Sequence, residues 1–117
     1  VRKYASHSRL RMAAIALTTD TSALTAAGND MGFENIFARQ MQAIGKRGDV
    51  AIGITTSGRS SNVIKALETA RSMALATVAF CGGTGGDWLR GARGAALAND
   101  QNLDRAWLLW KREVRGE

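Results

Sequence analysis

The amino-acid sequence predicts an α/β domain in which helices pack on a parallel sheet. Three short apolar runs of strand length alternate with segments whose apolar residues recur at helical spacing. The chain has 117 residues, which is enough for one domain with a single modest core. Apolar residues make up 45% of it and charged residues 22%, as in folded proteins rather than disordered ones.

The predicted strands are residues 13–17, 50–54 and 76–81. Between the first two, an apolar stripe predicts a helix that ends at Gly45. Its members are Phe33, Ile36, Phe37, Met41 and Ile44. A second stripe follows the second strand, and its members are Val63, Ile64, Leu67, Ala70 and Ala74. Right-handed crossovers are expected to place both helices on the sheet.

The rest of the chain is less regular. Residues 82–98 contain six glycines, which interrupt any periodicity and predict a loop. A final helix is expected from Asp100. Its apolar face would consist of Leu103, Ala106, Trp107, Trp110 and Val114. We therefore divide the chain into a basic lead-in at 1–12, a core at 13–86 and a tail at 87–117.

The net charge of +6 is concentrated at the two ends of the chain. Residues 1–12 hold four basic side chains and no acidic one, whereas residues 13–87 are balanced. A basic excess attracts nucleic acid when it accompanies a recognition motif or aromatic platform. Neither is found in the N-terminal run, so solvated charge is favoured over nucleic-acid binding.

Several other classes are disfavoured. No apolar run approaches the roughly 18–20 residues that span a bilayer, and no signal peptide is recognisable, so we expect a cytoplasmic protein without a membrane partner. A single cysteine, Cys81, excludes an internal disulfide and a cysteine-based metal cluster. The only histidine, His7, has no ligand-spaced neighbours and is expected at the surface. We expect no metal site in this chain.

The segment at 52–63 is the best candidate for chemistry, because an apolar strand runs into hydroxyls, a glycine and then a helix. Ligands of open parallel sheets bind at the carboxyl ends of strands, and a helix N-terminus adds free N–H groups and a positive dipole end. A phosphate monoester suits this turn. The ordinary alternative is a structural helix cap at Ser60 or Ser61. The segment lacks the lysine and spacing of a P-loop.

Four motifs make the sequence resemble phosphoheptose isomerases of the SIS (sugar isomerase) family, from about residue 2 to residue 86. They are the run at 14–26 with Gly28-Asn29-Asp30, then Phe37-Ala38-Arg39-Gln40, Gly48-Asp49-Val50, and the Thr-Thr-Ser-Gly turn. The resemblance implies a flavodoxin-like three-layer sandwich, incomplete at the N-terminus and diverged at the C-terminus. It also implies interconversion of sedoheptulose 7-phosphate and glycero-manno-heptose 7-phosphate, for lipopolysaccharide precursors. Similar enzymes are cytoplasmic homotetramers, often with zinc.

The same resemblance implies particular binding residues. The phosphate would be held by Thr55, Thr56, Ser57 and Ser60. Asn29 and Asp30 would contact the hydroxyls of the sugar. Asp30 has an ordinary alternative as a turn residue before Gly32.

The proton-transfer residues of the family are not matched. Aldose–ketose exchange needs a base and an acid beside the substrate. Similar enzymes use a glutamate on an N-terminal helix, which would end just before Val1, and a histidine in a Gln-Glu-x-His pattern. This chain has no histidine after Gly86, so we assign no catalytic residue to it. Loss of that helix would uncover apolar surface, and we expect a homo-oligomer.

An alternative function is a non-catalytic sugar-phosphate-binding or regulatory module of the same family. One such relative, of the replication-initiator-associating type, has a turn that resembles Ser-Thr-Arg-Gly-Asn-Ser. This chain has Thr56-Ser57-Gly58 instead, which favours the heptose branch.

Overall fold

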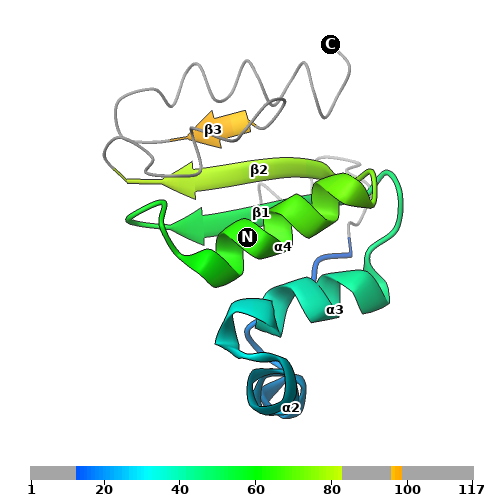
Figure 1. Ribbon diagram of the computed structural model, residues 1–117. Coiled ribbons are helices and arrows are strands. Elements are labelled where there is room, and N and C mark those ends of the chain that lie inside the picture. The colour runs from blue at the N-terminus through cyan, green and yellow to red at the C-terminus, as the bar shows by residue number, and fades with distance from the viewer. Residues whose placement is uncertain (1–12, 83–95, 99–117) are drawn as a thin grey trace, which may run out of the picture.

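The computed structural model describes residues 13–82 and 96–98. The described helices are α2 (Thr21–Met31), the 3-10 helix η1 (Phe33–Asn35), α3 (Ile36–Ile44) and α4 (Ser61–Ser72). The strands are β1 (Val50–Thr55), β2 (Ala76–Cys81) and β3 (Ala96–Ala98). Figure 1 shows the strands side by side, with α4 across the sheet and α3 and α2 following it outward.

The sheet is parallel throughout, in the order β1-β2-β3. β1 and β2 pair over their whole length, from Val50 opposite Ala76 to Thr55 opposite Cys81. α4 is the crossover between them, as the sequence predicts. The predicted α/β class is confirmed, as are the helices at α3 and α4 and the end of α3 at Gly45. Ala74, predicted on the stripe of the second helix, lies beyond its end at Ser72 and has a φ of 62°.

The core lies between α4 and one face of the sheet. Ala51, Leu67, Ala70 and Ala79 are all buried there. Gly53, in the middle of β1, lets the helix approach closely, because a Cβ at this position would lie 2.6 Å from Cδ1 of Leu67. The apolar stripe predicted from helical spacing therefore packs on a strand that lacks a side chain at the closest point.

The opposite face of the sheet is apolar, and it is exposed along β1, although Val78 of β2, opposite Ile52 in the register, is buried. Val50, Ile52 and Ile54 alternate with the buried residues of β1 and are 42%, 61% and 74% exposed. Phe80 of β2 lies beside Ile54 in the register and is 41% exposed. We call these four side chains the open face. Among the described helices, none covers it.

The strand predicted at residues 13–17 is wrong. Residues 13–16 have no regular structure, and Leu17 begins a turn. A strand needs a neighbour to satisfy its backbone groups, and no described strand pairs with this segment. Its end is held instead by the side chain of Gln40, whose Nε2 donates to the Leu17 carbonyl at 2.9 Å. Ile15 remains 71% exposed.

Helix α2 was not expected from periodicity. Its start is fixed by Asp20, whose carboxylate accepts a hydrogen bond from the Ala23 amide at 3.0 Å. The basic lead-in with His7, most of the glycine-rich loop and the predicted helix from Asp100 lie outside the described residues. Within the described part, no helix has the length and apolar character needed to cross a membrane.

Candidate functional site

The candidate site is the turn that joins β1 to α4, at the carboxyl end of the sheet. We call residues 55–60 the hydroxyl turn. The pleat of β1 places Thr55 on the helix-facing side, where it is 7% exposed, and the chain then emerges so that Thr56 and Ser57 are exposed. Gly58 has a φ of 67°, a left-handed conformation that glycine adopts without steric cost.

Two hydroxyls of the turn are joined to each other. Oγ1 of Thr55 and Oγ of Ser60 are 2.8 Å apart, and either can be the donor. Ser60 occupies the N-cap position of α4, but its side chain makes no capping hydrogen bond. Ser60 therefore stands at the predicted cap position but does not form the hydrogen bond of a cap. The first turn of α4 keeps amides that its N-cap side chain does not satisfy.

The turn also has hydrogen-bond donors that are free to bind an anion. Ser57 Oγ accepts a hydrogen bond from the Arg59 amide at 3.2 Å, which leaves the Ser57 proton available to donate. Within the described residues, the amides of Ser61 and Asn62 have no protein acceptor. Because the helix dipole also places positive potential here, an oxyanion is the ligand that this arrangement favours.

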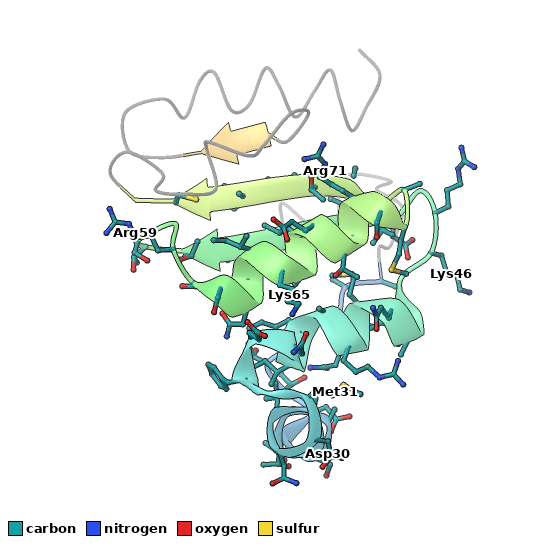
Figure 2. The ribbon with its side chains drawn as sticks, viewed as in Figure 1. Asp30, Met31, Lys46, Arg59, Lys65 and Arg71 are labelled. Atoms are coloured by element: carbon teal, nitrogen blue, oxygen red, sulfur yellow. The ribbon has the colours of Figure 1, made fainter. Side chains whose placement is uncertain are left out.

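Among the described residues, the side chain that neighbours the turn in the sheet adds no negative charge. Cys81 lies opposite Thr55 in the last register pair of the sheet. Burial raises the pKa of the Cys81 thiol above its usual value, so the group stays neutral at neutral pH. Arg59 is exposed at the outer end of the turn, as Figure 2 shows. Among the described groups, a phosphate at the turn would therefore meet hydrogen-bond donors and the Arg59 cation, while the buried thiol stays uncharged.

Asn29 and Asp30 lie elsewhere. They are exposed in the last turn of α2, and Nδ2 of Asn29 donates to Oδ1 of Asp30 at 2.9 Å. Figure 2 shows Asp30 on α2 and Arg59 at the hydroxyl turn, with α3 between them in this view. No described hydrogen bond links the two regions. The structure thus gathers Thr55, Thr56, Ser57 and Ser60 and leaves the two predicted sugar contacts apart from them.

The described residues do not fit the zinc ion that the resemblance implies. Among them, no group of three His, Cys, Asp or Glu side chains comes together. Cys81 is the one thiol of the chain and is buried, opposite Thr55 in the sheet register. We therefore assign no zinc ligand and no zinc-dependent step to these residues.

One residue beside the turn was missed by sequence reasoning, which treated it only as part of a loop. Gly82 follows β2, and its amide donates to the carbonyl oxygen of Thr56 at 3.0 Å. The sequence feature that could have indicated Gly82 is its position directly after a predicted strand, at the edge of the sheet where ligands bind.

Comparison with known protein families shows to which family the chain belongs. The sequence profile of the SIS domain matches residues 3–82. The chain belongs to the SIS domain family. The matched part of this SIS domain includes the hydroxyl turn and ends at Gly82.

Individual relatives are phosphoheptose isomerases. The enzyme of Paramagnetospirillum magneticum is 58% identical over 80 residues, which are 68% of this chain and 42% of the relative. That of Aquifex aeolicus is 60% identical over 78 residues, 67% of this chain and 41% of the relative. The solved phosphoheptose isomerase of Neisseria gonorrhoeae superimposes with a TM-score of 0.72 at 40% identity, covering 89% of this chain and 60% of that one. The SIS domain described here thus spans about two-fifths of these curated relatives.

Proposed function

We propose that this SIS domain binds a sugar phosphate through the hydroxyl turn and belongs to an isomerase that interconverts sedoheptulose 7-phosphate and glycero-manno-heptose 7-phosphate. The observation that carries the proposal is the turn at the end of β1, where unused hydroxyl protons and helix amides meet. The likeness to phosphoheptose isomerases supports the choice of sugar phosphate. The product would serve the synthesis of lipopolysaccharide heptose. We also propose a cytoplasmic location, because phosphorylated sugars are made and consumed there.

Each group in the turn has a proposed part. Ser57, Thr56 and the amides of Ser61 and Asn62 donate to the phosphate oxygens, whereas the Val63 amide already donates to Oδ1 of Asn62 at 2.9 Å. Thr55 acts with Ser60 as a pair, in which the buried hydroxyl donates to Ser60 and Ser60 donates to the phosphate. Hydrogen bonds to a charged oxygen contribute about 1.5–3 kcal/mol each. Three or four of them would therefore account for most of a micromolar affinity, which is about 8 kcal/mol.

Asn29 and Asp30 are proposed to contact the sugar hydroxyls. Because they lie on α2, apart from the turn, this part of the proposal requires α2 to approach the bound substrate. No described residue is assigned the base or the acid of the isomerisation. Phosphate binding is therefore the part of the function that this chain can be tested for by itself.

Calorimetric titration with sedoheptulose 7-phosphate tests the site. Ser57→Ala and Ser60→Ala are each expected to raise the Kd by about 10- to 150-fold, because each removes one hydrogen bond to a charged oxygen. The matched control is Ser72→Ala at the other end of α4, where the hydroxyl bonds only the Thr69 carbonyl. The control should bind as the wild type does. A folded wild-type chain that does not bind, or an equal loss in the control, would contradict the proposal.

We further propose that the chain forms a homo-oligomer through the open face. The four side chains are all apolar, and they lie on the same face of two adjacent, paired strands. Two copies that meet through the same patch would therefore bury apolar area without burying a charge. Contiguous exposed apolar patches of this kind mark interaction surfaces.

Light scattering across a concentration series checks this association. The wild type is expected to be larger than a monomer, and Ile54→Lys is expected to shift it to a monomer, because an unpaired ammonium would be buried at the contact. Phe33→Lys is the control, since Phe33 is 72% exposed and lies on η1, away from the sheet. A monomeric wild type, or dissociation by the control alone, would refute the interface.

A further inference from the structure

The ends of β1 and β2 remain connected beyond the sheet. The last register pair is Thr55 with Cys81. One residue further on, the Gly82 amide donates to the carbonyl oxygen of Thr56 at 3.0 Å. The first residue after β2 is thereby tied to the first residue after β1. Thr56 is also the point at which the chain turns outward into the exposed part of the hydroxyl turn.

This contact leaves no room for a side chain at position 82. A Cβ there would lie 2.7 Å from the carbonyl oxygen of Thr56, closer than real Cβ atoms come to any neighbour. The obstructing atom belongs to the backbone, so no rotamer change can relieve the overlap. Among the described glycines, those with positive φ are Gly32, Gly48 and Gly58, and Gly82 is not one of them. The requirement for glycine at position 82 is therefore one of space rather than of backbone conformation.

We propose that Gly82 is a positioning residue for the phosphate site, which rests on the function proposed above. Its amide fixes the direction of the Thr56 carbonyl, and its missing side chain lets the end of β2 support the turn. The peptide between Thr56 and Ser57 is then held before ligand arrives. Binding to a loop already in place avoids the entropy cost of ordering it, which is why support from outside a site raises affinity.

The test is Gly82→Ala, with Gly45→Ala as a matched control. At Gly45 the same two features occur, away from the turn: the amide donates to the Met41 carbonyl at 2.8 Å, and a Cβ would lie 2.8 Å from that oxygen. Both variants thus force a methyl group against a backbone oxygen that accepts a hydrogen bond from the same residue. We expect both to lower the thermal midpoint.

Only Gly82→Ala is expected to weaken ligand binding. In calorimetry with sedoheptulose 7-phosphate, its Kd should rise about tenfold or more, whereas Gly45→Ala should stay within about twofold of the wild type. Wild-type affinity in folded Gly82→Ala, or an equal loss in both variants, would overturn the positioning role.

A ligand-free readout separates this inference from the proposed function. In amide NMR spectra without ligand, Gly82→Ala should shift the resonances of Thr56, Ser57 and Gly58, and Gly45→Ala should leave them in place. Unmoved turn resonances in Gly82→Ala would refute the contact. Shifted resonances together with a wild type that binds no phosphate would preserve the structural role of Gly82 and refute the proposed function.

Discussion

Replacement of Leu67 with alanine is expected to lower the free energy of unfolding by about 2–5 kcal/mol. Leu67 is 3% exposed and packs from α4 onto β1, directly over Gly53. Glycine has no side chain that can move into the space, so the deletion leaves a cavity rather than a repacked core. Single domains are stable by only about 5–15 kcal/mol, and this loss is therefore a large share of the total.

Urea denaturation followed by circular dichroism measures this effect through the midpoint and slope of the transition. Ile15→Ala serves as the control, because Ile15 is an aliphatic residue of the same size that is 71% exposed. Its unfolding free energy should change by no more than about 0.5 kcal/mol. Equal losses in the two variants would mean that the contact between α4 and β1 is not the core of this domain.

The helices and strands that were predicted correctly are those whose own residues show a pattern of apolar side chains. Helices α3 and α4 each show an apolar stripe, and β1 and β2 are short apolar runs between turns. The run at 13–17 is also short and apolar but is not a strand, because strand formation depends on a neighbour as well as on local sequence. Periodicity cannot reveal which strand has a partner.

Helix α2 is the opposite case, a helix that forms although periodicity does not predict it. Of its residues only Ala27 is buried, so no wide apolar stripe marks it and periodicity gives little indication. Its N-terminal signal is local and polar, namely the carboxylate of Asp20 three residues before Ala23. A search for caps would have found this helix where a search for hydrophobic faces did not.

The candidate site likewise has a part that the sequence predicts and a part that it does not. The hydroxyl turn was predictable because its residues are contiguous and follow an apolar strand. The bond between Thr55 and Ser60 and the support from Gly82 depend on how the turn folds back and on which strand ends beside it. The first contact depends on the local fold of the turn and the second joins segments distant in the sequence, and a single sequence carries no direct sign of either. The roles of Asn29 and Asp30 remain predictions.

Thr55→Val is expected to weaken both the fold and phosphate binding. Valine keeps the shape of the buried side chain but removes Oγ1, so Ser60 loses its partner at 2.8 Å. Leaving a partly buried hydroxyl unpaired costs about 1–3 kcal/mol of stability. The Ser60 hydroxyl is then free to turn away from the ligand, and the Kd for sedoheptulose 7-phosphate should rise. Thr55→Ser, which keeps the hydroxyl, should retain most of the affinity.

A double-mutant cycle decides whether the two hydroxyls act as one unit. If Thr55 acts through Ser60, then Thr55→Val should cause little further loss of affinity in a chain that already carries Ser60→Ala. If Thr55 donates to the phosphate directly, the two losses should add. Additive losses would restore Thr55 as an independent phosphate ligand. Non-additive losses, together with the retained affinity of Thr55→Ser, would show that the buried hydroxyl works by orienting its exposed neighbour.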